Sequence, residues 1–230
     1  MLSQMTTLPR MPTTLPADPT TERAQTVREE IANALSHGIG FLLAVASLPI
    51  LLSFAVEHGS ASVVGACVFS VTMILLYLSS CLYHALPAGR AKAVFNKLDH
   101  VAIYIFIAGS YTPFALGALR GGWGWTLFGL VWGCALLGVL LKSFNFLRHP
   151  GWSTGLYVAM GWLVLIAAGP LVERVSFNGL VLLVAGGVSY TIGALFFLLD
   201  SKLPFAHFVW HLFVIGGSTC HFFAALWHAK

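Results

Sequence analysis

Charged residues are scarce in this chain of 230 residues: they make up 9% of it, whereas hydrophobic residues make up 58%. Soluble domains carry about 25% charged residues, so this composition excludes an ordinary water-soluble protein. The basic residues behind the pI near 9.0 are scattered over loops, which excludes a nucleic-acid-binding patch. The composition therefore indicates an integral membrane protein, with membrane lipids rather than nucleic acid as its partners.

Cysteine is also sparse, and no C-x-x-C motif occurs. Cys67, Cys81, Cys134 and Cys220 all lie in apolar segments. This pattern predicts no disulfide framework, and we interpret the four residues as small core side chains.

The N-terminal residues lack an apolar run, which excludes an ordinary secretory signal peptide. They are rich in threonine and proline, a composition that favours disorder. We predict a disordered cytoplasmic tail over residues 1–28, followed by a membrane domain over residues 29–230.

Seven apolar runs, each long enough to cross a bilayer, divide the membrane domain. They lie near residues 34–56, 61–84, 98–119, 122–141, 152–172, 177–199 and 205–228. The predicted fold is all-α, a polytopic bundle of seven transmembrane helices. Pro170 predicts a kink in the fifth span, and the G-x-x-x-G pair Gly129 and Gly133 predicts close helix packing in the fourth.

Lysine and arginine are distributed unequally between the two sides that this topology defines. Nine lie on the side of the N-terminus: Arg10, Arg23, Arg28, Arg90, Lys92, Lys97, Lys142, Arg148 and Lys202. Three lie on the other: Arg120, Arg174 and Lys230. The positive-inside rule then predicts a cytoplasmic N-terminus and an extracytoplasmic C-terminus in the cell membrane.

Polar residues that a membrane span seldom contains recur at one predicted depth. They are Glu30, Asn33 and His37 at the start of span 1, Ser80 and His84 at the end of span 2, Asp99 at the start of span 3, and His207 and His211 at the start of span 7. Odd-numbered spans start inside and even-numbered spans end inside, so all of these residues fall in the cytoplasmic half. Ionisable groups at such a depth are costly and usually functional.

His207 and His211 form an H-x-x-x-H pair, which places two imidazoles on one helix face at a spacing that can bind one metal ion. His84 supplies a third nitrogen from another helix. Three histidines with an open fourth position are typical of catalytic zinc sites. Asp99 and Ser80 are then candidates to hold the water or to support the ligands.

Several alternatives stay open at this stage. Cys81, one turn before His84, could replace a histidine as a ligand, and His37 could either brace the site or reach the metal. Imidazole-rich ligation also suits iron, nickel and copper. His221 lies ten residues after His211, about 15 Å further along the helix, so it cannot bind the same ion and is predicted to join a buried polar network.

These residues also carry a family resemblance. The stretches "EEIANALSHGIG", "SSCLYHAL", "NKLDHVAIYIFIAGSYTPF" and "HFVWHLFVIGGSTCH" together resemble the progestin and adipoQ receptor superfamily, specifically its bacterial branch, the hemolysin III proteins. The resemblance implies a seven-helix bundle with zinc near its cytoplasmic side. It places the ligands on His84, His207 and His211, and it places Ser80 and Asp99 at the positions that contact the metal-bound water.

The remaining polar residues are assigned a supporting role. They are Glu30, Asn33, Ser36, His37 and His221. The long N-terminal domain of the animal receptors is absent from this sequence, so hormone binding is not expected. The leading interpretation is a zinc-dependent hydrolase of lipid amides or esters, of the ceramidase type implied by relatives, linked to membrane lipid homeostasis. The alternatives are a non-catalytic, zinc-stabilised lipid sensor and a haemolytic pore.

Overall fold

The computed structural model describes residues 23–147 and 149–229, and all regular structure in these ranges is helical. The helices are α1 (Val27–Ala55), η1 (Val56–His58), α2 (Ser60–Ala85), α3 (Arg90–Leu116), α4 (Gly122–Ser143), α5 (Pro150–Gly161), η2 (Leu163–Ala167), α6 (Ala168–Arg174), α7 (Phe177–Leu198) and α8 (Ala206–His228). Most of the predicted tail lies outside the described residues, as do Arg10, Arg148 and Lys230. Helix α1 begins seven residues before the predicted span because Thr26 and Glu29 form a capping box.

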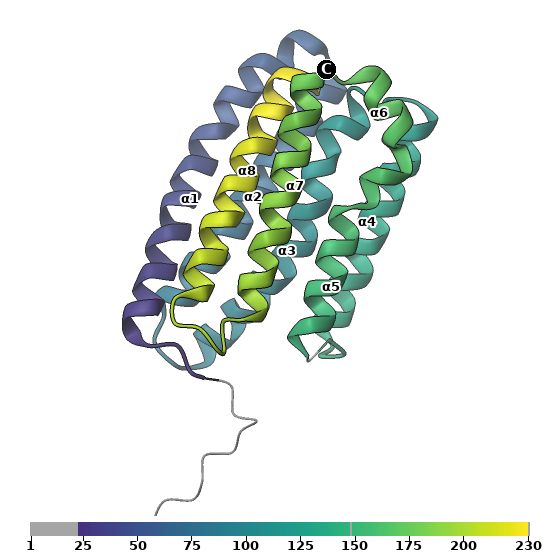
Figure 1. Cartoon of the computed structure of the whole chain (residues 1–230). Helices are drawn as coiled ribbons and strands as arrows, with labels where there is room; N and C mark the ends of the chain where they lie inside the picture. The colour runs from purple at the N-terminus through teal and green to yellow at the C-terminus, as the bar shows by residue number, and fades with distance from the viewer. Residues whose placement is uncertain (1–22, 148, 230) are drawn as a thin grey trace, which may run out of the picture.

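The long helices pack side by side as a bundle, in which α1 contacts α2 and α8, α3 contacts α2 and α4, and α7 contacts α8 (Figure 1). The start of α1, the end of α2, the start of α3 and the start of α8 all lie at one end of this bundle, while the C-terminus lies at the opposite end (Figure 1). We call the first of these the site end. Four separate stretches of sequence are thereby brought to one level.

Within the described residues, six helical segments are long and apolar enough to cross a membrane. They cover residues 27–58, 60–85, 122–143, 150–174, 177–198 and 206–228. Helix α3 has 27 residues and lies within the bundle, but Lys92, Lys97 and Asp99 make its first half polar, and it does not join the six. The chain is a multi-pass membrane protein, whereas the seventh span and the orientation remain predictions.

Large apolar side chains cover the outer surface of the bundle. Leu35 and Leu42 on α1, Leu136 on α4 and Val184 on α7 are each more than half exposed. An apolar exterior of this kind fits contact with lipid tails rather than with water. The interior holds aromatic residues such as Phe69, Tyr77 and Phe106, together with the buried polar residues of the site end.

The fifth predicted span is interrupted rather than continuous. Helix α5 ends at Gly161, and a 3₁₀ segment leads into α6, just before Pro170, which has no N–H to bond back to the preceding turn. The Tyr111 hydroxyl of α3 shares its one hydrogen between the carbonyls of Gly161 (2.6 Å) and Met160 (3.0 Å) and accepts from the Val164 N–H (3.1 Å). The predicted kink is therefore a break in the helix. Tyr111 of the neighbouring α3 forms hydrogen bonds with backbone groups that the break leaves unpaired.

The predicted packing role of Gly129 and Gly133 is wrong within the chain, because a Cβ at either position would meet open space. Close approaches occur at other glycines. A Cβ at Gly40 would overlap the Tyr77 ring, which allows α1 and α2 to approach closely near the site. The G-x-x-x-G pattern gives only spacing, and it does not reveal which face a neighbouring helix covers.

Candidate metal centre

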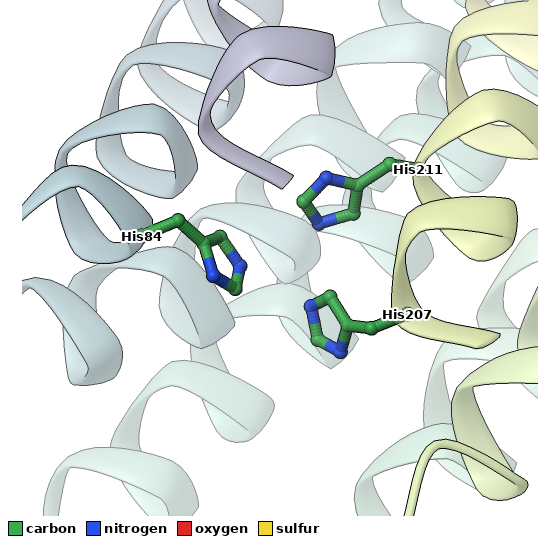
Figure 2. A group of neighbouring side chains, drawn as sticks. All are labelled: His84, His207 and His211. Carbon is green, nitrogen blue, oxygen red and sulfur yellow. The ribbon is translucent and has the colours of Figure 1, made fainter. Parts of the chain in front are cut away.

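Three histidines meet at the site end of the bundle. His84 comes from the last turn of α2, and His207 and His211 come from the first two turns of α8 (Figure 2). One nitrogen from each lies within 4.8 Å of the other two, and all three residues are buried. The ring centroids lie 4.8–5.1 Å apart. The spacing of the two histidines on α8 produces the geometry that the sequence predicts, and the three can hold a metal ion.

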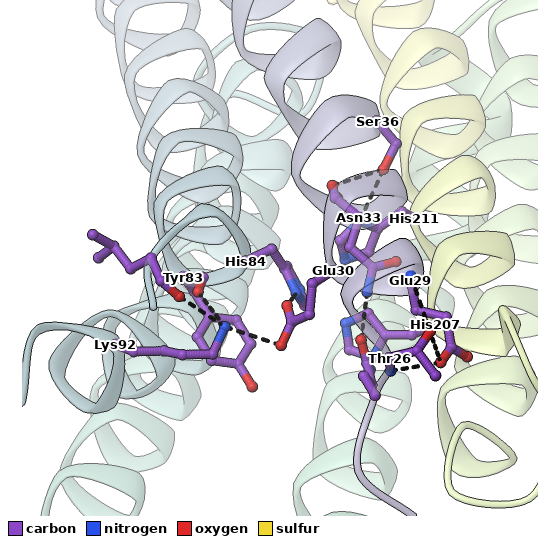
Figure 3. Close-up of polar contacts among 12 residues, drawn as sticks. Thr26, Glu29, Glu30, Asn33, Ser36, Tyr83, His84, Lys92, His207 and His211 are labelled. Atoms are coloured by element: carbon purple, nitrogen blue, oxygen red, sulfur yellow. Dashed lines mark hydrogen bonds and ion pairs between the residues drawn. The ribbon is translucent and has the colours of Figure 1, made fainter. Parts of the chain in front are cut away.

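Each imidazole is oriented by a hydrogen bond at Nδ1. His84 Nδ1 lies 2.7 Å from Glu30 Oε2, and His207 Nδ1 lies 3.0 Å from Asp200 Oδ2. His211 Nδ1 lies 3.1 Å from the Ser36 hydroxyl and 3.3 Å from the Asn33 carbonyl (Figure 3). Carboxylate and carbonyl partners at one ring nitrogen fix the tautomer and leave the other nitrogen free to bind metal.

The Nε2 atoms of the same three histidines are buried and have no hydrogen-bond partner. Buried polar atoms are rarely left unpaired, so three unpaired acceptors that converge on one point require an explanation. A divalent cation bound by the three Nε2 atoms satisfies all of them, and neutral imidazole is a common ligand of such ions. The residues present therefore fit a metal ion.

Lys92 adds a further contact to this arrangement. Its Nζ lies 2.9 Å from Glu30 Oε1, and it donates to the Tyr83 carbonyl (3.0 Å) at the end of α2 (Figure 3). Glu30 is thus held between His84 and Lys92, with one carboxylate oxygen for each. The carboxylate that orients the metal ligand is itself fixed in place.

A second acidic residue, Glu29, anchors the start of α8. Its carboxylate accepts from the Arg23 guanidinium (2.6 and 2.8 Å), from Thr26 (2.8 Å) and from the Phe205 N–H (2.8 Å). Phe205 adopts a left-handed conformation (φ 58°) that is unfavourable for a bulky residue, so this bond supports a strained helix start. Arg23 also donates to the Asp200 carbonyl (3.3 Å). We call this group of contacts the Glu29 anchor.

The Glu29 anchor and Asp200 are absent from the sequence-based prediction. Asp200 lies in the loop between α7 and α8, where no helical periodicity relates it to the histidines. Arg23 falls within the predicted tail. One available signal was the capping pattern formed by Thr26 and Glu29, which marks a helix start and draws attention to the acidic residue there.

Asp99 and Ser80 lie next to each other between α2 and α3. Both are buried, and Ser80 precedes His84 by one helical turn. The Ser80 hydroxyl is close to the Asp99 carboxyl but has no hydrogen bond with standard geometry. Asp99 faces a mainly apolar cavity, the first cavity, which is bounded by α3, α5, α7 and α8. The two predicted catalytic residues are therefore adjacent, and one of them faces open space.

His37 stacks directly on His211, with ring centroids 3.5 Å apart and planes 8° apart. Both of its nitrogens are buried and unpartnered, and its side chain also lines the first cavity. It is not one of the three residues whose nitrogens converge. Its stacking braces the His211 ring, which is the supporting role favoured from the sequence.

Two other predicted residues lie apart from the cluster. His221 Nε2 contacts the Leu183 carbonyl (3.3 Å) on α7, and its ring packs against Tyr190. Cys81 is not part of the three-residue group, and its Sγ faces Gly38 of α1. Among the described residues, the candidate metal ligands are thus three imidazoles.

Comparison with known proteins identifies the family of the chain. The family model described as "Haemolysin-III related" matches residues 25–222, which cover nearly all of the described chain. The chain belongs to the haemolysin-III related family. The match includes Glu29, Glu30 and the three histidines of the candidate metal centre, whereas Arg23 lies just before it.

Bacterial relatives within this family are similar over almost their whole length. Hemolysin-3 of Bacillus cereus is 49% identical over 205 residues, which cover 89% of this chain and 93% of the relative. The Hemolysin-3 homolog of Bacillus subtilis (strain 168) is 46% identical over 204 residues, 88% of this chain and 95% of the relative.

A more distant relative is the monocyte to macrophage differentiation factor of Homo sapiens. It is 28% identical over 211 residues, 86% of this chain and 84% of the relative. No solved structure matches the chain.

Proposed function

We propose that this protein is a zinc-dependent hydrolase that cleaves lipid amides or esters within the membrane. The observation that carries the proposal is the convergence of three unpartnered imidazole nitrogens, with no fourth thiolate, imidazole or carboxylate ligand among the described residues. Structural zinc sites usually have four protein ligands, whereas catalytic sites keep one position for water or substrate.

His84, His207 and His211 would hold the ion. When bound there, zinc would supply Lewis acidity to a carbonyl and to water. Glu30 and Asp200 behind two of the imidazoles raise the basicity of these ligands. We propose zinc over iron, nickel or copper because three neutral imidazoles with an open position are a common zinc arrangement.

Asp99 would act as the general base. It would take the proton from the attacking water as the oxygen adds to the carbonyl carbon, and it would return a proton to the departing amine or alcohol as the C–N or C–O bond breaks. The adjacent Ser80 hydroxyl would donate a hydrogen bond to the developing oxyanion. The products are a fatty acid and an amine or alcohol.

The apolar first cavity supports a lipid substrate. Asp99 lies on its wall together with apolar residues such as Ile103, Phe106 and Val158. A lipid chain in this cavity would place its polar head near the site end. A zinc ion held at the site end would then act on the bond that joins the polar head of the lipid to its chain.

One observation favours a second function, a non-catalytic lipid sensor. None of the three metal-binding histidines lines the first cavity, although Asp99 and His37 do. A zinc ion that only ties α2 to α8 would fit this separation. The pore interpretation receives less support, because the cavity walls are mainly apolar and a conducting path needs polar lining across the membrane.

Product release by the purified protein distinguishes the hydrolase from the sensor. We expect fatty acid release from ceramide or phospholipid in mixed micelles by wild type, and a loss of at least about 100-fold in Asp99→Asn with its zinc content unchanged. Glu57→Gln, the corresponding change at an exposed position of η1 outside the cavity, is the matched control and keeps the activity. The hydrolase proposal fails if wild type releases no product from any of these lipids while it retains zinc.

The orientation is part of the same proposal. The distribution of basic residues supports a cytoplasmic N-terminus, which would place the site end near the inner leaflet of the cell membrane. Reporter fusions at the two termini test this directly, since an enzyme that is active only in the cytoplasm should work at the N-terminus and not at the C-terminus.

A further inference from the structure

A second site lies along the bundle from the metal centre, around His221 of α8. This residue follows His211 by ten positions on one continuous helix, which places it about 15 Å further along the axis. Its Nδ1 is buried and has no hydrogen-bond partner. No residue of the metal centre reaches this level, so the unpaired nitrogen needs a separate explanation.

The position of the His221 ring is fixed by α7. A Cβ at Gly186 would overlap the ring at Cδ2 and Nε2, so the absence of a side chain there allows this edge to lie against the α7 backbone. Nε2 contacts the Leu183 carbonyl, and the Tyr190 ring packs against the imidazole. Because the Cδ2–Nε2 edge of the ring faces α7, the Nδ1 atom faces away from α7.

The chemistry of the contact with Leu183 decides what Nδ1 can bind. A carbonyl oxygen only accepts, so Nε2 must carry the proton in this bond. In a neutral imidazole, Nδ1 is then an acceptor with a free lone pair. The missing partner must therefore be a donor, such as an O–H group, and a ketone or an ester carbonyl cannot take its place.

The space beside His221 is larger than a water molecule and is apolar. His221 lines both the first cavity, of about 110 Å³, and a second cavity of about 370 Å³, and Trp162 and Gly187 also line both. A single water needs only about 10–15 Å³. Apolar residues such as Phe114, Leu127 and Leu171 line the second cavity. The occupant must therefore be mainly hydrocarbon.

The other polar side chains on the wall of the first cavity already have partners. The hydroxyls concerned are those of Ser110, Tyr111, Thr154, Tyr157, Tyr190 and Thr191. Away from the site end, where Asp99 and His37 lie, the unpaired Nδ1 of His221 is the exception on this wall among the described residues. Away from the site end, His221 Nδ1 is thus the buried polar atom on this wall that has no hydrogen-bond partner at all within the described part of the chain.

We propose that His221 recognises a lipid chain that carries a hydroxyl group near its middle. The chain would run from Asp99 at the site end past His221 into the second cavity, and its hydroxyl would donate to Nδ1. The proposal rests on a lipid as the occupant of the proposed hydrolase and adds the feature by which one class of lipid is selected.

Displacement of tritiated stearic acid from zinc-loaded protein in detergent micelles tests the proposal. Stearic acid corresponds to the fatty acid product of hydrolysis. We expect 12-hydroxystearic acid to displace it at about five- to tenfold lower concentration than unlabelled stearic acid does, as expected for one added hydrogen bond. The acceptor-only 12-oxostearic acid and the head-proximal 2-hydroxystearic acid should show no such gain.

Two variants locate the effect. His221→Phe keeps a ring of similar shape and should lose the preference for 12-hydroxystearic acid while still binding stearic acid. The same change at an exposed histidine of η1, His58→Phe, should retain the preference. Equal displacement by the four acids, displacement by none, or a preference that persists in His221→Phe overturns the proposal. If the cavity holds only trapped water, the four acids displace the label equally. If His221→Phe fails to fold, the comparison of acids on wild type still decides.

The readout is binding and requires no turnover. A protein that prefers the 12-hydroxy acid but cleaves no lipid would support the role of His221 and contradict the hydrolase. A protein that cleaves lipids without this preference would do the reverse. The two proposals can therefore fail independently.

Discussion

Glu30 Oε2 lies 2.7 Å from Nδ1 of His84, and this contact joins the start of α1 to the end of α2. On the other side of the centre, Asp200 makes the corresponding contact with His207 from the loop before α8. Two of the three imidazoles thus have a carboxylate behind them, each from a different part of the chain. The metal centre depends on residues that never touch the ion.

The three imidazoles should bind close to one zinc ion per chain. His207→Ala or His211→Ala removes one ligand, so we expect the ion to be lost and the melting temperature to fall, because a ligand that binds only the folded state stabilises it. Metal analysis by mass spectrometry and thermal unfolding measure the two effects. His58→Ala, which alters an exposed histidine of η1, should change neither. Full zinc content in both ligand variants would contradict the assignment.

Neutralising Glu30 should weaken the metal site without removing a ligand. Glu30→Gln keeps the size of the side chain but loses the carboxylate behind His84, and the loss of such a partner typically lowers metal affinity by about 10- to 100-fold. Competition with a chelator of known affinity measures the change. Glu57→Gln, at an exposed position in η1, is the control. Unchanged affinity in Glu30→Gln would show that the contact has no influence on the ion.

The Glu29 anchor should control the order of the first turn of α8. In Glu29→Gln the side chain can no longer form a charged pair with Arg23 and holds the Phe205 N–H more weakly. The loss of the charge weakens both hydrogen bonds, and the left-handed conformation of Phe205 loses part of its support. We expect faster amide hydrogen exchange at Phe205 and in the turn that follows, with exchange in α4 unchanged. Equal exchange in wild type and variant would argue against the anchor.

Glycine substitutions separate true close contacts from a sequence pattern. Gly40→Ala places a Cβ against the Tyr77 ring and should lower the free energy of unfolding by about 1–3 kcal/mol, the usual cost of overpacking. Gly129→Ala enters open space and should leave stability unchanged or slightly raised, since alanine favours helix more than glycine does. Unfolding in detergent compares the two variants. A larger loss in Gly129→Ala would contradict the observed packing.

The sequence allowed much of the metal centre to be predicted, because helices impose a fixed period. His207 and His211 are one turn apart, so their shared face follows from the backbone alone. His84 could be added because spans that alternate in direction bring the end of one helix to the level of the start of another. These arguments need the number and direction of spans but no knowledge of side-chain packing.

The residues that could not be predicted lie outside this regularity. Asp200 belongs to a loop, and its distance from His207 depends on how the chain turns between α7 and α8. Arg23 precedes α1 in a segment whose composition suggests disorder, yet it is held by Glu29. Tyr111 can bond the backbone groups left unpaired by the break after α5 only because α3 lies beside that segment. Each is a contact between separate elements, which neither periodicity nor composition encodes.

Arg23 connects the segment before the first helix to the candidate metal centre. Its guanidinium pairs with Glu29 and also contacts the carbonyls of Asp200 and Leu203, the loop that carries the partner of His207. Cleavage or truncation between Arg23 and Thr26 would remove these contacts and leave Glu29 as the remaining support of that loop through Phe205, although no candidate ligand is removed. The order of the candidate metal centre is therefore expected to depend on a residue that precedes the first helix.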